Sequence, residues 1–116
     1  MNVRLERLDR ATVVIPEGRL DFDAAADFQK QLEGVFSSAT PPGAVIIDCG
    51  MLDYVSSAGL RVFLLGARAA QKAGVAFAIC DLKPAVREVF DLSGFSRVLA
   101  VHPDRATALG QGPGRT

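Results

Sequence analysis

Apolar and polar residues alternate with a period of two near the start of the chain, which is typical of β-strands with one buried face. In residues 3–8 this pattern turns Val3, Leu5 and Leu8 inward, and a short polar turn then leads to a second apolar run at 11–15. Because the turn between the two runs is so short, we expect them to form a β-hairpin.

Three later apolar segments also predict strands. They cover residues 44–49, 75–80 and 97–101, and the first is expected to end near Asp48. Pro16 directly follows the hairpin's second apolar run and cannot donate a ladder hydrogen bond. We therefore expect Pro16 at a sheet edge or in a bulge.

Helical periodicity occupies the segments between these strands. Apolar side chains recur at helical spacing in residues 23–37, and at i, i+3, i+4 and i+7 in residues 57–72, where Gly74 is expected to end the helix. Pro84 suits the first turn of a third helix, which we expect Gly94 to end.

The alternation of strands and helices predicts an α/β fold. We expect a mixed β-sheet of four to five strands packed against about four helices, the last of them over 104–109. A chain of 116 residues with 49% hydrophobic content forms one domain, which we place at residues 1–109. The tail at 110–116 is rich in glycine and cannot bury apolar surface, so we expect it to be disordered.

Two adjacent serines, Ser56 and Ser57, stand at the start of the helix predicted over 57–72. Either hydroxyl can cap this helix by accepting a hydrogen bond from a free N–H group of the first turn. Opposite Phe63 and Ala67, one stripe of the helix is expected to face solvent. The stripe consists of Arg61, Leu64, Leu65, Arg68 and Lys72. Leucines among basic residues on an exposed face favour a contact surface.

A phosphate on Ser57 would change this surface without disturbing the fold. It would add about −1.5 to −2 charges beside the helix N-terminus and within reach of Arg61. The domain would tolerate that charge, whereas a partner bound to the stripe would not. Ser57 is therefore a candidate switch.

Charge and composition exclude several kinds of partner. The 13 Lys and Arg residues balance 13 Asp and Glu residues, so nothing favours nucleic acid or an anionic membrane. No apolar run approaches the ~20 residues that span a bilayer, and the N-terminus lacks a signal-peptide core, so we expect a cytoplasmic protein. Cys49 and Cys80 lie in or beside apolar runs, and we expect both to be buried and reduced.

Catalysis has little support in the sequence. The only histidine, His102, is expected on the surface, and the serines lack a Gly-x-Ser-x-Gly elbow. Asp48 and Asp53 could flank the serine and hold a metal, although solvation of a strand end is the simpler explanation for each. We therefore expect a protein that is not an enzyme and needs no cofactor.

The segment from Asp48 to Leu60 resembles the signature of the STAS domain, in particular of stand-alone bacterial anti-sigma factor antagonists. The matching residues are Asp48, Tyr54-Val55 and Ser56-Ser57-Ala58-Gly59-Leu60. In that family the serine two residues before the glycine is phosphorylated, which corresponds to Ser57. Asp is common in the family at the position of Ser56, and Ser or Thr at that of Ala58. The departure at Ser56 leaves this second hydroxyl as the alternative acceptor.

Two other segments are similar to the same family. Gly18-Arg19-Leu20-Asp21 resembles a Gly-x-Leu-Asp stretch that lies close to the serine and gives an acidic residue to the kinase contact. From the residues alone, Asp21 or Asp23 is a helix cap, and the two roles can coexist. The segment 84–94 is also similar, so the resemblance covers about residues 10–109.

The resemblance implies a single STAS-like domain that switches partners. Its unphosphorylated form would bind an anti-sigma factor that is also a serine kinase, and would thereby free a sigma factor. Phosphorylation of Ser57 would weaken this complex, and a PP2C-type phosphatase would restore it. The residues expected to contact the partner are Asp21, Asp23, Asp53, Tyr54, Ser56, Ser57, Arg61, Leu64, Leu65 and Arg68.

Two other classes of function stay open. One is a STAS subunit that scaffolds a larger complex, such as a lipid-transport ABC system, without switching. The other is a module for a nucleotide or another small ligand, which the absence of a glycine-rich phosphate loop disfavours. The retained Ser57 and the Gly-x-Leu-Asp stretch favour the switch.

Overall fold

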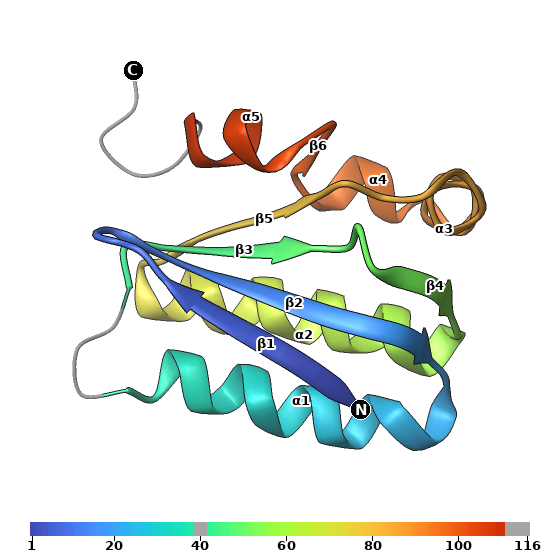
Figure 1. The fold of residues 1–116 in the computed structure, drawn as a ribbon, viewed down its shortest axis with the longest axis horizontal. Helices are drawn as coiled ribbons and strands as arrows, with labels where there is room; N and C mark the ends of the chain where they lie inside the picture. The colour runs from blue at the N-terminus through green and yellow to red at the C-terminus, as the bar shows by residue number, and fades with distance from the viewer. Residues whose placement is uncertain (39–41, 111–116) are drawn as a thin grey trace.

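The sheet is organised around strand β2 (Ala11–Leu20), which pairs with three other strands. A computed structural model describes residues 1–38 and 42–110 (Figure 1). Strand β1 (Asn2–Arg7) runs antiparallel to β2, while β3 (Ala44–Asp48) and β4 (Leu52–Val55) run parallel to successive parts of it. The predicted hairpin is therefore confirmed.

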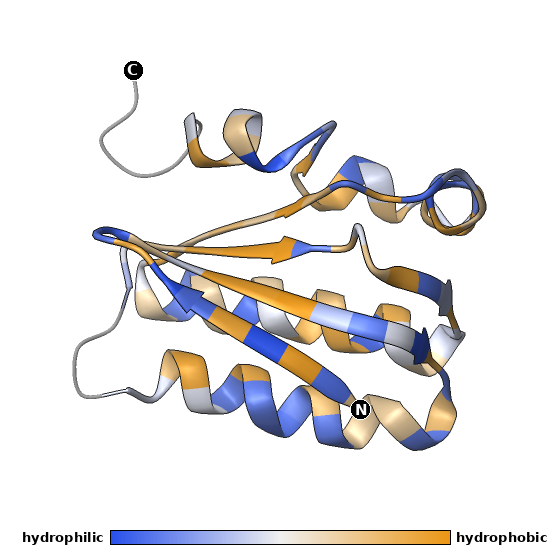
Figure 2. Ribbon diagram, in the orientation of Figure 1, coloured by the Kyte–Doolittle hydropathy of each residue, from blue (hydrophilic) through white to orange (hydrophobic). Residues whose placement is uncertain are grey.

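The remaining strands extend the sheet on the side of β3. Strand β5 (Ala76–Cys80) is parallel to β3, and the short β6 (Val101–His102) is parallel to β5. The order is thus β1-β2-β3-β5-β6, with β4 pairing the end of β2 beyond β3. Figure 2 shows how hydropathy follows position in the sheet. Strand β3 is hydrophobic up to its last residue, whereas hydrophobic and hydrophilic residues alternate along β1, at the sheet edge.

Helices cover both faces of the sheet in the described residues. Helices α1 (Phe22–Phe36) and α2 (Ser57–Ala73) lie side by side on one face, and α3 (Pro84–Leu92) packs next to β4 (Figure 1). The short α4 (Phe95–Val98) follows α3, and α5 (Arg105–Gly110) contacts the opposite face of the sheet.

Two hydrophobic cores result, one on each face of the sheet. The larger lies under α1, α2 and α3 and contains three aromatic rings, with Phe63 in edge-on contact with both Phe28 and Phe90 at centroid distances of 5.7 and 5.3 Å. The smaller lies under α5 and includes Val13, Ile46 and Ala108. The α/β class and the mixed sheet are confirmed, with six strands and five helices in the described residues.

Several local predictions were wrong. Residues 97–101 are not a strand, because the left-handed Gly94 (φ 81°) starts the single turn α4 and only Val101 continues into β6. Leu5 is 42% exposed, since β1 is an edge strand with β2 on one side only, and Leu8 is 44% exposed in the turn that follows β1.

Pro16 does not lie at an edge. It is buried inside β2, in the part of the strand between its pairing with β3 and its pairing with β4. No residue of β3 or β4 pairs with Pro16. On the side of β2 that faces β3 and β4, the missing N–H of Pro16 therefore removes no hydrogen bond between strands. The register shift in this region comes two residues later, between Gly18 and Arg19. The predicted disordered tail, residues 110–116, lies outside the described residues except for Gly110, which ends α5.

Candidate functional site

The start of α2 is fixed to the end of β2 through Ser56. The Ser56 hydroxyl accepts a hydrogen bond from the Gly59 N–H at 3.1 Å, which makes Ser56 the N-cap of α2. The same hydroxyl donates to the Leu20 carbonyl at 3.1 Å, and the Ser56 N–H donates to that carbonyl at 2.9 Å. Ser56 is therefore a structural connection between two segments that are 36 residues apart.

Gly59 allows this close approach of α2 to β2. A Cβ atom at position 59 would lie 2.7 Å from Leu20 Cγ and 2.9 Å from the Leu20 carbonyl oxygen. Both distances are too short for a carbon atom, so any larger residue would push the helix start away from the strand. The glycine of the serine motif is thus explained by packing.

Ser57 differs from its neighbour in both exposure and bonding. It is the first residue of α2 and is exposed, and its hydroxyl makes no hydrogen bond within the described part of the chain. The N–H groups of the first helical turn lie beside it, and Arg61 is exposed one turn further along. Of the two hydroxyls, that of Ser57 is the one accessible to another protein.

The predicted acidic residues surround this helix start but have separate roles. Asp21 is the N-cap of α1, accepting from the Ala24 N–H at 2.9 Å, which decides between the two predicted caps. Asp23 is exposed in the first turn of α1. Asp53 forms an exposed ion pair with Lys83, which precedes α3.

The structure adds Arg19 to the predicted residues. Its guanidinium lies 4.2 Å from the centroid of the Tyr54 ring, a cation–π contact between paired positions of β2 and β4. Tyr54 itself is 40% exposed. These two side chains are brought together by the pairing of β4 with β2. The sequence analysis did not predict β4, so it could not predict this contact.

The outer stripe of α2 is only partly exposed. Arg61, Arg68 and Lys72 face solvent as predicted, and Phe63 is buried on the opposite side. Leu64 and Leu65 are half-buried rather than exposed, because each lines a different hollow beside the helix. Leu65 faces α1, and Leu64 faces the segment 98–100.

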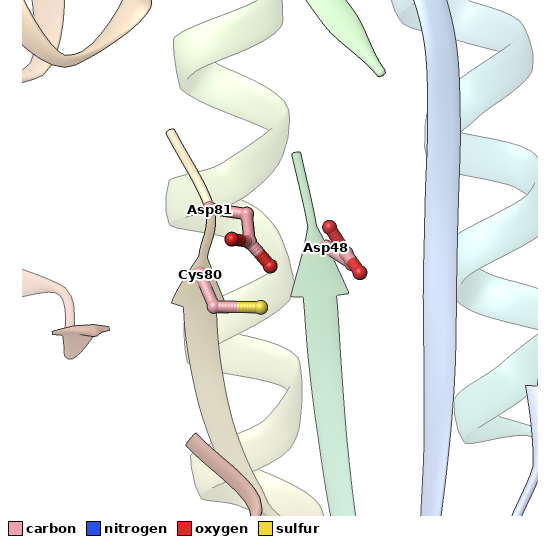
Figure 3. A group of neighbouring side chains, drawn as sticks. All are labelled: Asp48, Cys80 and Asp81. Atoms are coloured by element: carbon pink, nitrogen blue, oxygen red, sulfur yellow. The ribbon is translucent and has the colours of Figure 1, made fainter. Parts of the chain in front are cut away.

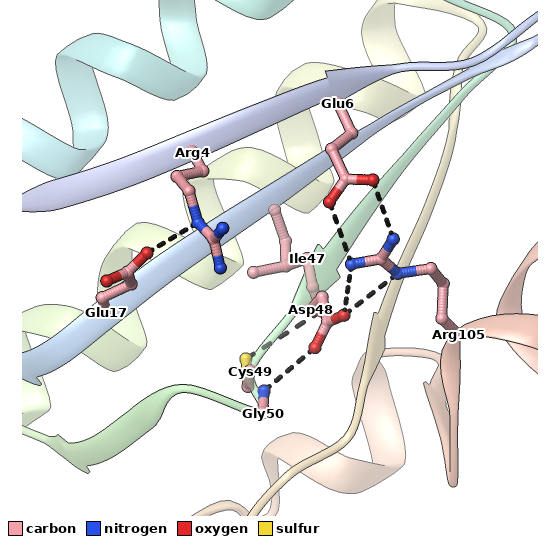
Figure 4. Close-up of polar contacts among 8 residues, drawn as sticks. All are labelled: Arg4, Glu6, Glu17, Ile47, Asp48, Cys49, Gly50 and Arg105. Carbon is pink, nitrogen blue, oxygen red and sulfur yellow. Dashed lines mark hydrogen bonds and ion pairs between the residues drawn. The ribbon is translucent and has the colours of Figure 1, made fainter.

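Asp48 does not belong to this site. Its carboxylate accepts hydrogen bonds from Arg105 of α5 at 2.8 and 3.1 Å, and Arg105 also binds Glu6 of β1 at 3.0 Å (Figure 4). The same figure shows an ion pair of Arg4 with Glu17 on the neighbouring hairpin. Asp48 pairs with Arg105 and Asp53 with Lys83, so each carboxylate has a different cationic partner. These ion pairs do not support the alternative in which both carboxylates hold a metal beside the serine.

A different group of potential metal ligands lies at the ends of β3 and β5. Asp48, Cys80 and Asp81 have ligand atoms within 4.8 Å of one another (Figure 3). Burial, then the carboxylates of Asp48 and Asp81, raises the pKa of the Cys80 thiol to about 12. Arg105 already binds the Asp48 carboxylate, so a cation at this group would compete with the guanidinium for that ligand. Cys49 and Cys80 are buried free thiols, as predicted.

A family model for the STAS domain matches residues 2–108. The chain belongs to the STAS domain family. Its three family-like segments meet in space, because Leu20 holds Ser56 and α3 packs against β4. The predicted resemblance is therefore confirmed.

Individual STAS relatives agree with this assignment. The chain is 36% identical over 110 residues to the Bordetella bronchiseptica protein named "Putative anti-sigma factor antagonist BtrV", covering 93% of this chain and 91% of that protein. A crystal structure of an anti-sigma factor antagonist from Mycobacterium paratuberculosis matches with a TM-score of 0.80 and 24% identity over 93% of this chain and 90% of that one. Unphosphorylated SpoIIAA, an anti-sigma factor antagonist, matches with a TM-score of 0.76 and 22% identity over 95% of each chain. In the described residues of this STAS domain, no helix has the length and apolar character that a membrane crossing requires.

Proposed function

We propose that this STAS domain is an anti-sigma factor antagonist whose binding is switched by phosphorylation of Ser57. In its unphosphorylated form it binds an anti-sigma factor that is also a serine kinase, and a sigma factor is released. The observation that carries the proposal is the accessible Ser57 hydroxyl at the start of a helix that is anchored through Ser56. The name of the Bordetella relative supports the same role.

Geometry favours Ser57 over Ser56 as the phosphate acceptor. The Ser56 hydroxyl is half-buried and uses both its proton and an acceptor position in hydrogen bonds to β2 and α2. Its phosphorylation would remove the proton that it donates to the Leu20 carbonyl and would place a phosphate where α2 packs against the end of β2. Ser57 needs no such rearrangement.

The proposed switch works through charge rather than through a change in shape. A phosphate on Ser57 adds about −1.5 to −2 charges, which the N-terminus of α2 and Arg61 accommodate within the domain. A partner in contact with this surface must desolvate or repel the added charge. We expect a loss of ~2 kcal/mol in binding free energy, which is about thirtyfold in affinity.

The partner surface we propose consists of the side chains around the helix start. Asp21, Asp23 and Asp53 provide acidic groups, Tyr54 an exposed aromatic ring, and Arg61 and Arg68 basic groups on α2. Ser56, Leu64 and Leu65 complete the predicted set from half-buried positions. The mixture suits recognition of another protein surface better than binding of a small molecule.

The domain itself contributes no catalysis in this proposal. The only histidine of the sequence, His102, is in β6, whose strand partner is β5. The partner kinase therefore adds the phosphate, and a PP2C-type phosphatase removes it.

The experiment that tests the proposal is phosphopeptide mass spectrometry on the protein from its own cells, with phosphatases blocked. Phosphate on Ser57 that is lost in Ser57→Ala and retained in Ser56→Ala is the expected result. Phosphate on Ser56 would move the site by one residue. If no phosphate were found in growth conditions that alter the activity of the sigma factor, the switch would be rejected.

A further inference from the structure

An apolar groove runs along the outside of the domain between α1 and α2. One hollow, of about 230 Å³, lies between the N-terminal turns of the two helices and is lined by Phe22, Ala58 and Arg61 among others. A second hollow follows it and reaches Phe36 and Ala69. The two hollows share Gln29, Val62 and Leu65, so they adjoin each other between helices that run in the same direction (Figure 1), and together they are called the groove.

Small residues leave this groove open. Gly66 faces it from α2, and a Cβ atom there would lie 3.1 Å from Phe77 and 3.4 Å from Leu32, so the helix packs closely at its base. Ala26 and Ala58 on the two walls are too short to fill the space above. The floor is therefore apolar and partly accessible to solvent.

Phe22 stands at the mouth of the groove and is 79% exposed. An aromatic ring so exposed at the first turn of a helix contributes little to the fold. Exposed aromatic side chains beside an apolar hollow are typical anchors of protein interfaces. What distinguishes Phe22 is the apolar hollow beside it, and together they form a candidate contact surface.

Two side chains of opposite charge line different parts of the groove. Arg61 lines its beginning from α2, and Glu33 lines its middle from α1. Both are exposed, and neither forms an ion pair within the described part of the chain. A ligand that matches both has a carboxylate near the start of α2 and a basic group further along.

We infer that the groove receives an amphipathic helix of the anti-sigma factor, with its apolar face against Phe22 and Leu65 and a carboxylate opposite Arg61. The inference rests on the proposed function, because Ala58 and Arg61 belong both to the groove and to the surface around Ser57. Helix α1 has 15 residues and is about 20 Å long, which is enough to seat three to four turns of a partner helix.

This placement also explains how one phosphate can control a larger interface. A phosphate on Ser57 stands at the mouth of the groove, one turn before Arg61. It competes for Arg61 and repels the partner's carboxylate, so it opposes the groove contact as well as the contact at the serine.

The test measures the affinity of unphosphorylated variants for each purified anti-sigma factor encoded in the genome that encodes this chain. Phe22→Ala removes the anchor, and Ala26→Trp fills the groove from an exposed position. Matched controls are Leu8→Ala, at the β1–β2 turn, and Ala106→Trp, exposed on α5. We expect both groove variants to bind about tenfold or more weakly and both controls to stay within about twofold of the wild type.

Each other outcome overturns the inference. Unchanged affinity in both groove variants, together with lost binding in Ser57→Asp, would leave the proposed function standing and reject the groove. If the wild-type protein bound none of these anti-sigma factors, both the proposed function and the groove inference would be rejected. Sedimentation that showed a wild-type dimer dissociated by Ala26→Trp would assign the groove to a second copy of the chain instead.

Discussion

Ser56 and Ser57 are adjacent in the chain but have opposite surroundings. Ser56 is half-buried and joins β2 to α2 through two hydrogen bonds of its hydroxyl, while Ser57 is exposed and unbonded in the described residues. The fold uses the first hydroxyl, whereas the second is the acceptor in the proposed phosphorylation. Substitution of Ser56 should therefore change stability, and substitution of Ser57 should change partner binding.

Ser56→Ala should lower the free energy of unfolding by about 1 kcal/mol, because it removes the N-cap of α2. Ser57→Ala is the matched control and should change stability by less than about 0.5 kcal/mol. Urea denaturation followed by circular dichroism measures both. Equal losses in the two variants would mean that the cap is shared between the serines.

Ser57→Asp should weaken binding of the anti-sigma factor by about tenfold, since it places a negative charge in the proposed interface. Ser57→Asn has nearly the same shape without the charge and should bind within about threefold of the wild type. Titration calorimetry with the purified anti-sigma factor measures this difference. Equal weakening by Asp and Asn would show that shape, rather than charge, controls the contact.

At the scale of elements, the strands with continuous apolar sequence were predictable and the irregular ones were not. Residues 44–48 are buried throughout, so β3 stands out in the sequence. The four residues of β4 follow a buried, exposed, exposed, buried pattern that matches neither period, and in the described residues the strand partner of β4 is β2. Residues 97–101 looked like a strand, but the left-handed Gly94 starts a helical turn instead.

The candidate site divides in the same way. Ser57, Asp21 and Arg61 could be found from the serine motif, the Gly-x-Leu-Asp stretch and the helical period. The Arg19–Tyr54 contact and the groove beside Phe22 depend on how distant segments pack, which one sequence does not reveal. Leu64 and Leu65 were placed on the correct face, but their partial burial required the positions of the neighbouring elements.

Gly59→Ala tests the contact between α2 and β2. The added methyl would clash with Leu20, so we expect a loss of about 2 kcal/mol in the free energy of unfolding. Gly34→Ala is the control, because a methyl at this exposed position of α1 meets nothing within 4 Å. It should stabilise the protein by about 0.5–1 kcal/mol through helix propensity. A neutral Gly59→Ala would show that α2 can shift without cost.

At the scale of the whole molecule, one side chain connects distant parts of the chain. Arg105 of α5 binds Glu6 of β1 and Asp48 of β3, so it ties the first strand to the last helix across the α5 face of the sheet. Cys49 and Cys80 lie on opposite faces of the same sheet, each within one of the two hydrophobic cores. The stability of the whole fold is therefore linked to the protonation of both thiols.

Stability should fall as the pH rises above about 9. Burial raises the pKa of the Cys49 thiol well above its ordinary value of 9.0 and that of Cys80 to about 12. Between these values the unfolded chain releases thiol protons that the native chain keeps, so unfolding becomes more favourable by up to about 1.4 kcal/mol per pH unit and thiol. Urea denaturation at pH 7.5 and at pH 10 measures the effect. Cys80→Ala should have a smaller pH dependence, and an identical slope would contradict this explanation.

In the proposed switch, the anchoring of α2 also determines how the kinase must recognise this protein. Many kinases bind their acceptor residue in an extended peptide, but Ser57 is the first residue of a helix that Ser56 fastens to Leu20. Its presentation depends on residues far away in the chain, so a short peptide containing Ser57 lacks the determinants of the site. The enzyme must instead dock on the folded domain. In the proposed switch, recognition of the substrate and binding of the partner therefore use the same folded surface.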